Sequence, residues 1–402
     1  MISWGFRTRG LRPIGLDVGH NSIKMIQLLM NGEHISVLAA DEARIEHSIN
    51  SDEQSRRNFI ISSVRKMLAR GNFQGRNVVS CLPSGKLKIT SLRLPETEED
   101  EIEQSLRKEV AQRFGLNPDE DSMDYVIAGS VRQGDEIKNE LILFAIDKET
   151  IQDHIQMLSE AGLKPVAIDT IPCALFRSFE RSLRRQEDRD RTVVFVDVGS
   201  RVTTVVFGRE GKISFVKEIP IGGEKFNQEV AAKLNISISE AEILRDAMRM
   251  QRGLSMPKPD SVLQESAGNY RQMEASTRQV MVDAVSAVVE NLAKEISLCL
   301  RYYTVTFRGM RVERAVIAGG GAYEDILLSV LRRHLTVELE VAQPLRGFDL
   351  SSERANLNFD SDRRGFLCEW AVAVGLSLKG WKAANNEEPW SKCELQESYE
   401  RN

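Results

Sequence analysis

The sequence IGLDVGHNSIK (residues 14–24) passes from one apolar segment to another through an Asp-Val-Gly turn, which predicts a strand, a tight turn and a second strand. The same pattern returns in VVFVDVGSRVTTVVF (residues 193–207), where Asp197 stands 180 residues after Asp17. A further turn follows each copy, at Gly32 and at Gly211. This repeat is much longer than the roughly 20 to 50 residues of a solenoid unit. We therefore predict a duplicated domain and a molecule with two lobes.

Helical and strand patterns alternate around the two copies, which predicts an α/β protein. Between the copies the predicted helices cover residues 60–68, 102–114 and 151–158, and the predicted strands cover 77–83, 125–133, 140–147 and 165–169. After the second copy we predict helices at 222–234 and 274–307, a strand at 312–318, and an apolar helix within 365–381. Ser239 and Glu242 have the spacing of a capping box that opens a further helix. Residues 252–272 read as a loop.

The composition is that of a packed protein and excludes several classes. The 402 residues carry 54 basic and 59 acidic side chains, a net charge of −5 that argues against a chain-wide nucleic-acid binder. No apolar stretch reaches the roughly 18 residues that a membrane-spanning helix needs. The five cysteines form no C-x-x-C pair and read as reduced core thiols. We expect a cytoplasmic protein.

The two aspartate turns predict a site for phosphate and a divalent cation. Glycine at a strand end lets backbone amides point inward, where they can bind phosphate oxygens. Two such turns that face each other would bring Asp17 and Asp197 to one Mg²⁺, which prefers oxygen ligands. Lys24 can neutralise phosphate charge. An isolated Asp-x-Gly turn is ordinary, so the prediction depends on the repetition.

The glycine triplet at 319–321 follows the strand at 312–318 and precedes a helical pattern. Its backbone can approach a flat ring or a phosphate closely. The triplet does not complete a G-x-G-x-x-G fingerprint, and no Walker-type G-x-x-x-x-G-K-[ST] is present. The five histidines lack the spacing of a zinc site, and no G-x-S-x-G elbow supports a serine hydrolase.

In their order, these motifs resemble the PilM branch of the actin and heat-shock chaperone ATPase superfamily, which is related to the cell-division protein FtsA. The resemblance covers residues 14–381. IGLDVGHNSIK is similar to the first phosphate loop of the family, VFVDVGSRVTTVVF to the second, and VIAGGGA (316–322) to the adenosine loop. SEAEILR (239–245) is similar to the A-E-x-x-[KR] element, which implies ribose and adenine contacts by Glu242 and Arg245.

The implied cofactors are ATP and Mg²⁺, with the metal held by Asp17 and Asp197. The expected cofactor-binding residues are Gly19, His20, Asn21, Ser22, Lys24, Gly199, Ser200, Thr203, Glu242, Arg245, Gly319, Gly320 and Gly321. Three residues depart from the pattern: His20 replaces a small hydroxyl residue, and Arg201-Val202 replace glycine and threonine. Ile171 stands where filament-forming relatives place a water-orienting glutamate, so slow or absent turnover is expected.

The implied fold is a two-lobed actin-like ATPase fold built from duplicated RNase-H-like domains, with a small α+β subdomain inserted in the first lobe. The expected units are a flexible tail at 1–13, a first lobe at 14–191 with the inserted subdomain at about 84–164, a second lobe at 192–382 with a helical subdomain at about 221–311, and a disordered tail at 383–402.

The implied function is that of a cytoplasmic ATP-binding scaffold in a type IV pilus or related secretion platform. Its expected partner is a PilN-like bitopic inner-membrane protein, whose cytosolic tail it would bind; other platform components are possible, nucleic acid is not expected, and the membrane is reached only through the partner. Residues 95–125 carry 11 acidic and three basic side chains, which suits a basic juxtamembrane tail. The alternatives are an FtsA-like filament-forming division ATPase and an active ATPase or small-molecule kinase on the same fold.

Overall fold

The computed structural model describes most of the chain, namely residues 10–32, 34–83, 85–133, 135–180, 191–251, 274–307, 310–350 and 366–379. The predicted loop at 252–272 and the predicted tail at 383–402 lie outside these residues. So do residues 1–9 of the predicted N-terminal tail, whereas residues 10–13 form the start of the first strand.

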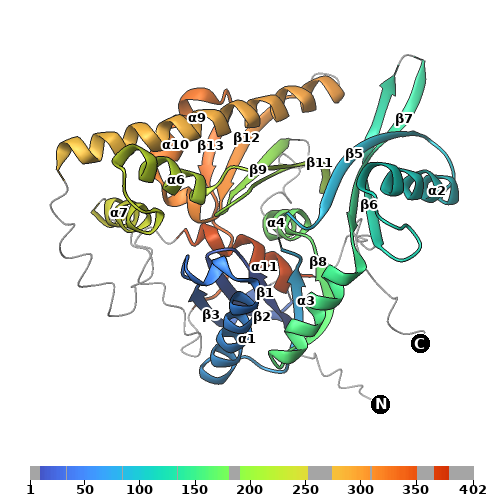
Figure 1. The fold of residues 1–402 in the computed structure, drawn as a ribbon. Coiled ribbons are helices and arrows are strands. Elements are labelled where there is room, and N and C mark those ends of the chain that lie inside the picture. Colours follow the sequence, from blue (N-terminus) through green and yellow to red (C-terminus); the bar gives the residue numbers. More distant parts are fainter. Residues whose placement is uncertain are drawn as a thin grey trace.

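Two five-stranded sheets form the centres of two lobes, and both have the same strand order (Figure 1). The first has the order β3-β2-β1-β4-β8 and contains β1 (Gly10–Val18), β2 (Ser22–Asn31), β3 (His34–Arg44), β4 (Asn77–Cys81) and β8 (Lys164–Asp169). The second has the order β11-β10-β9-β12-β13 and contains β9 (Thr192–Val198), β10 (Thr203–Arg209), β11 (Lys212–Ile219), β12 (Val312–Ala318) and β13 (Glu338–Val341). The predicted duplication and the two-lobed α/β fold are confirmed.

Helices cover both sheets. The first lobe carries α1 (Glu53–Arg70) and α3 (Lys148–Glu160), and the second carries α6 (Gly223–Leu234), α7 (Ile238–Gln251), α9 (Ala275–Thr306) and α10 (Asp325–His334). The helix α1 begins where the Asp52 side chain accepts a hydrogen bond from the Ser55 amide and ends at Gly71.

The capping box of α7 differs from the prediction. Ser237 and Glu240 exchange the reciprocal bonds: the Ser237 amide donates to the Glu240 carboxylate, and the Glu240 amide donates to the Ser237 hydroxyl. The predicted pair, Ser239 and Glu242, lies two residues further along. The local sequence contains the same Ser-x-x-Glu spacing twice, and the helix begins at the first of the two. Glu242 is thereby left on the helix surface for contacts outside α7.

Two short helices connect the lobes by crossing between them (Figure 1). The helix α4 (Ile171–Glu180) follows the first sheet but contacts β9, β10 and β11 of the second. The helix α11 (Ala371–Ser377) follows the second sheet but packs on β1, β2 and β4 of the first. The predicted second lobe at 192–382 therefore includes a helix that lies on the sheet of the other lobe.

Glycines allow the crossing helices to approach closely. A Cβ atom on Gly375 of α11 would lie 1.8 Å from the carbonyl oxygen of Ala174 in α4. A Cβ atom on Gly15 of β1 would lie 2.1 Å from the carbonyl oxygen of Ala373. Because both contacts are with backbone atoms, a methyl group on Gly15 would push α11 away from β1, and one on Gly375 would push α11 away from α4.

The inserted subdomain is a three-stranded sheet with one helix. The sheet has the order β5-β7-β6 and contains β5 (Lys88–Pro95), β6 (Ser122–Gln133) and β7 (Glu136–Ile146), with α2 (Glu99–Glu109) on one face and a π-helical turn at Val110–Phe114. Its other face contacts β11 of the second lobe. Glu140 of β7 accepts hydrogen bonds from Arg93 at 2.7 Å and from the Tyr302 hydroxyl of α9 at 3.0 Å. The predicted range 84–164 also includes α3, which packs against α1 of the first lobe.

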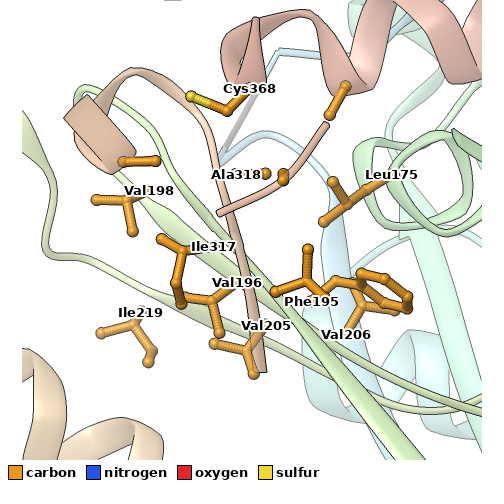
Figure 2. Close-up of a cluster of buried hydrophobic side chains, with 14 of the residues drawn as sticks. Leu175, Phe195, Val196, Val198, Val205, Val206, Ile219, Ile317, Ala318 and Cys368 are labelled. Atoms are coloured by element: carbon orange, nitrogen blue, oxygen red, sulfur yellow. The ribbon is translucent and has the colours of Figure 1, made fainter. Parts of the chain in front are cut away.

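The core of the second lobe aligns the strands that end at the candidate site. Figure 2 shows Val196 and Val198 of β9 beside Ile317 of β12, with Leu175 of α4 further to the right. All four side chains are buried, as expected for central parallel strands that are covered on both faces. In the parallel pairing of β9 and β12, Ala318 lies opposite Asp197. This register places the glycine triplet at the same sheet edge as the second aspartate turn.

Candidate nucleotide site

Two half-buried carboxylates, Asp17 and Asp197, lie one residue before the ends of β1 and β9. Burial, together with the nearby charge of Asp17, raises the pKa of Asp197 to about 7. Burial also raises the pKa of Asp17, although Lys24 acts in the opposite direction. The predicted pair is thus brought together within electrostatic reach. Two carboxylates in this environment favour a cation between them.

Lys24 is the buried cation nearest to this pair, and it is surrounded by acids. Its Nζ lies 3.2 Å from a Glu42 carboxylate oxygen and donates a hydrogen bond to the Ser22 hydroxyl. Although burial alone lowers the pKa of Lys24, Glu42, Glu369 and Asp17 together raise it. Burial raises the pKa of Glu369 in turn, and this carboxylate accepts a hydrogen bond from the Tyr323 hydroxyl.

The site therefore carries more negative than positive charge. Asp17, Glu42, Asp197 and Glu369 act on one lysine, which leaves room for a divalent cation in the charge balance. No group of three or more side chains suited to holding a metal ion occurs among the described residues. An ion at Asp17 and Asp197 would need further oxygen ligands, which water and phosphate supply when Mg²⁺ binds with a nucleotide.

The first turn is held by an arginine that the sequence reasoning did not identify. Arg56 of α1 donates to the carbonyl oxygens of Gly19 at 2.7 Å and of His20 at 2.9 Å. The Asn50 side chain donates to the same His20 carbonyl at 3.1 Å. Because both carbonyls are satisfied from outside, the turn keeps a fixed shape. No local spacing in the sequence links Arg56 to the turn.

The tips of the two turns meet at Glu224, the second residue of α6. The Arg201 guanidinium donates to the Glu224 carboxylate at 2.7 Å, and His20 Nε2 lies 3.8 Å from the same oxygen. Burial, followed by the positive charge of Arg201, lowers the pKa of His20 to about 4, so the imidazole is neutral at pH 7. Glu224 was not among the predicted site residues.

Two polar atoms in the turns are buried without a hydrogen-bond partner among the residues that the structure describes. They are Ser200 Oγ and His20 Nε2. A buried polar group without a partner is costly, and a bound ligand commonly supplies one. Thr203, by contrast, donates its hydroxyl hydrogen bond to the Ile221 carbonyl at 2.6 Å. Of the predicted hydroxyl donors, Ser200 therefore has the clearest capacity for a phosphate.

The glycine triplet packs against the second turn. Gly319 has a φ of +80°, and a Cβ atom there would lie 2.4 Å from Asp197 Oδ1. A Cβ atom on Gly321 would lie 2.4 Å from Val198 Cγ1. A Cβ atom on Gly320 would meet nothing within 4 Å. The outer glycines are thus required by packing, whereas the middle one borders open space.

The two predicted base and ribose residues differ in their surroundings. Glu242 accepts a hydrogen bond from Arg44 of β3 at 2.8 Å, a contact that joins the second lobe to the first. Arg245 is buried, where it donates to Glu324, to the Asn227 side chain and to the Gly223 carbonyl. Its guanidinium also lies 5.1 Å from the centre of the Phe226 ring. The Arg245 guanidinium thus joins the helical subdomain to the start of α10, while its Nε has no hydrogen-bond partner among the described residues.

The residues present fit a magnesium–nucleotide complex on three observations: two carboxylates that interact electrostatically, the Ser200 hydroxyl without a partner among the described residues, and the open space at Gly320. With two sheets of identical order, crossing helices and aspartate turns at the shared edge, the molecule has the two-lobed actin-like ATPase fold.

Comparison with known proteins identifies the family. A family model described as type IV pilus assembly protein PilM matches residues 15–256, so the chain belongs to this family. A model of the cell division protein FtsA matches residues 194–355. The chain is 21% identical over 224 residues to the cell division protein FtsA of Bacillus subtilis (strain 168). That match covers 56% of this chain and 49% of the relative, so the chain spans about half the length of this curated relative.

Two solved structures support the fold. The structure described as a PilM-PilN type IV pilus biogenesis complex aligns with a TM-score of 0.70 and 21% identity, over 92% of this chain and 99% of that one. The ethanolamine utilization protein EutJ from Carboxydothermus hydrogenoformans aligns with a TM-score of 0.50 and 15% identity, over 92% and 89% of the two chains. Within the described ranges, no helix is long and apolar enough to cross a membrane.

Proposed function

We propose that this protein binds ATP and Mg²⁺ between its lobes and serves as a cytoplasmic scaffold of a type IV pilus or related secretion platform. The observation that carries the nucleotide part is that the two aspartate turns, one from each lobe, approach a common point: His20 and Arg201 of the two turns both lie within 4 Å of the Glu224 carboxylate, and Asp17 is close enough to Asp197 to raise its pKa. Family membership supports the pilus part.

In this proposal each lobe contributes one half of the site. Asp17 and Asp197 would hold the metal, mostly through water, and the metal would neutralise phosphate charge. The amides and side chains of the two turns would hold the phosphates, with Ser200 as a free hydroxyl. Gly320 would give the nucleoside room beside the turn. Because the halves come from different lobes, the nucleotide would set their relative orientation.

Hydrolysis in this site is expected to be slow or absent. Phosphoryl transfer to water needs a group that positions the water in line with the leaving oxygen. Ile171, at the start of α4, cannot do this. The nearby Asp169 is buried, and its carboxylate pairs with Arg177 at 2.8 Å and with Lys379 at 3.6 Å. Asp169 is therefore committed to holding α4 and the C-terminal segment in place.

The proposed partner is a PilN-like bitopic inner-membrane protein, bound through its cytosolic tail. The structure aligned above is a PilM-PilN complex, which makes this partner class the first to test. Acidic side chains at the start of α2, from Glu98 to Glu101, are exposed and can attract a basic tail over a distance that salt screens. The protein would then reach the membrane only through this partner.

The proposal is tested by partner capture in the presence of nucleotide. A peptide from the cytosolic tail of the PilN-like protein is immobilised, and binding is measured with and without Mg²⁺–ATP. We expect ATP to change the affinity of the wild type but not that of Asp197→Ala, which should remain folded by circular dichroism. Equal nucleotide dependence in both proteins would contradict the proposal.

A second candidate is a filament-forming protein of the FtsA kind, which the match of residues 194–355 to the FtsA model favours. Light scattering with and without ATP and lipid vesicles distinguishes it from the scaffold. Nucleotide-dependent growth in scattering would favour the filament. An active ATPase or small-molecule kinase would instead release phosphate or phosphorylated product at a rate well above background.

A further inference from the structure

At the tips of the two turns, two guanidinium groups and the neutral His20 imidazole surround one acid. Arg56, Arg201 and His20 approach one another closely enough that burial and the charge of Arg201 lower the pKa of both His20 and Arg56. Glu224 is the acid within contact distance of this cluster. Such a cluster on two opposed turns has the charge of a binding site for an anion.

Glu224 occupies this cluster incompletely. Its carboxylate binds Arg201 at 2.7 Å but remains 3.8 Å from His20 Nε2, which is too long for a hydrogen bond. Ser200 Oγ, in the second turn itself, is likewise without a partner among the described residues. A carboxylate has two oxygens, whereas a terminal phosphate offers three. A phosphate group can therefore serve Arg201, His20 and Ser200 together.

The position of the cluster indicates that it would bind the terminal phosphate and not the phosphates nearer the nucleoside. Along the second turn, the glycine triplet packs against Asp197 and Val198, whereas the start of α6 packs against Gly199 and Ser200. The Glu224 amide donates to the Ser200 carbonyl at 2.7 Å, which fixes α6 at that end of the turn. A nucleoside at the triplet would thus place the end of its phosphate chain toward Arg201.

We propose that Glu224 competes with the terminal phosphate of a nucleoside triphosphate for Arg201 and His20, and that these three residues distinguish triphosphate from diphosphate. This inference rests on the proposed nucleotide site. It adds that triphosphate binding breaks the Glu224–Arg201 ion pair, whereas diphosphate binding leaves the pair intact. The first turn of α6 is therefore the element that differs between the two bound forms.

The test measures the dissociation constants of Mg²⁺–ATP and Mg²⁺–ADP by isothermal titration calorimetry on the full chain. Removing the competing charge in Glu224→Gln should tighten ATP binding about tenfold and change ADP binding by less than about twofold. Arg201→Ala should weaken ATP binding about tenfold and leave ADP binding unchanged. Glu229→Gln is the matched control, since Glu229 lies on the same helix and pairs with Lys233 at 4.0 Å instead.

The outcomes separate this inference from the proposed function. If the wild type binds neither nucleotide, the proposed site is wrong and the inference falls with it. If the wild type binds both nucleotides but Glu224→Gln and Arg201→Ala leave the ATP-to-ADP affinity ratio unchanged, the inference is overturned and the site stands. Should Glu224→Gln fail to fold in a thermal melt, Arg201→Ala, whose side chain is half exposed, still decides the question.

Discussion

Asp197 shows at the scale of a single residue that the site is built at a cost to stability. Its pKa is raised to about 7, first by burial and then by Asp17. An aspartate whose pKa in the folded protein is raised above the ordinary value of about 3.9 contributes stability at a pH below about 3.9. This contribution is lost as the pH rises toward 7. At neutral pH the protein thus tolerates a buried charge that a bound cation would relieve.

We therefore predict that Asp197→Asn flattens the pH dependence of stability. Between pH 4 and pH 8 the free energy of unfolding of the wild type without Mg²⁺ should fall relative to that of the variant, by up to about 4 kcal/mol. Denaturant titrations across this range measure it. Asp119→Asn serves as the control, since Asp119 is exposed and should behave like the wild type. Parallel pH profiles for Asp197→Asn and the wild type would contradict the prediction.

The Arg245–Glu324 pair has the opposite pH dependence of stability. Burial alone would raise the pKa of Glu324, but Arg245 and Arg249 lower it to about 2. A carboxylate whose pKa is lowered in the folded protein contributes stability at a pH above its ordinary pKa of about 4.3. This contribution is lost as the pH falls toward 2. The pair therefore stabilises the helical subdomain at neutral pH.

For this pair we predict that Arg245→Met destabilises the protein by about 3 to 5 kcal/mol, because it leaves Glu324 buried with one guanidinium fewer. Chemical denaturation at pH 7 gives the value. Arg314→Ala is a fair comparison, since the Arg314–Glu340 pair is partly exposed and should contribute at most about 1 kcal/mol. A loss below about 1 kcal/mol for Arg245→Met would show that the pair does not hold α7 in place.

Single residues also show where sequence reasoning ends. Asp17 and Asp197 were predictable because each lies within a motif that repeats. Arg56 and Glu224 were not predictable, because each contacts the turns from a helix and no fixed sequence spacing indicates the contact. The same holds for Glu369, which comes to Lys24 from the far end of the chain.

At the scale of elements, the strand-to-glycine junction after β12 combines packing and binding in three consecutive residues. Gly319 and Gly321 fit against the second turn, whereas Gly320 borders open space. The three positions thus respond differently to the same added methyl group. This difference separates a structural role from a role in binding.

We predict that Gly320→Ala leaves the melting temperature within about 2 °C of the wild type but weakens nucleotide binding about tenfold, because the methyl group enters the space proposed for the nucleoside. Gly321→Ala should instead lower the melting temperature, since its methyl group would meet Val198. Thermal melts and nucleotide titrations on both variants provide the readouts. Unchanged nucleotide affinity in Gly320→Ala would remove the triplet from the site.

Most elements were predictable from periodicity, and the exceptions have physical reasons. The long helix α9 and the strands of both hairpins follow their apolar patterns. The strands β5 and β13 were not predicted, because β5 alternates only weakly in burial and β13 has four residues. The helix α4 was not predicted either, because it is buried on most sides and lacks the polar face of an amphipathic helix. The packing of α11 on the first sheet depends on Gly15 and Gly375. The need for glycine at these positions is visible only in the folded structure, where α11 meets β1 and α4.

At the scale of the whole molecule, the inserted subdomain joins the two lobes. It arises from the first lobe, yet its sheet contacts β11 and its Glu140 binds Tyr302 of α9. Arg44 adds a second connection across the lobes by donating to Glu242 and Asp246, each at 2.8 Å. A change in lobe orientation therefore has to alter contacts at both places.

We predict that the acidic start of α2 speeds association with a basic partner tail. Reversing Glu98, Glu99 and Glu101 to lysine should slow association with the tail peptide about tenfold at low salt and have little effect at high salt, because salt screens surface charges. Stopped-flow measurements at two salt concentrations test this. A control variant replaces the same residues with aspartate, which keeps the negative charge. Equal rates for the wild type and the lysine variant at low salt would contradict the prediction.

The central claim is that the two aspartate turns bind one nucleotide from opposite lobes, and a titration with a fluorescent ATP analogue tests it most directly. The account predicts saturable binding by the wild type with Mg²⁺, and marked weakening when the metal is chelated or when either Asp17→Asn or Asp197→Asn is introduced. A wild type that binds no analogue at millimolar concentration, or that binds it equally well with both aspartates replaced, would contradict the account.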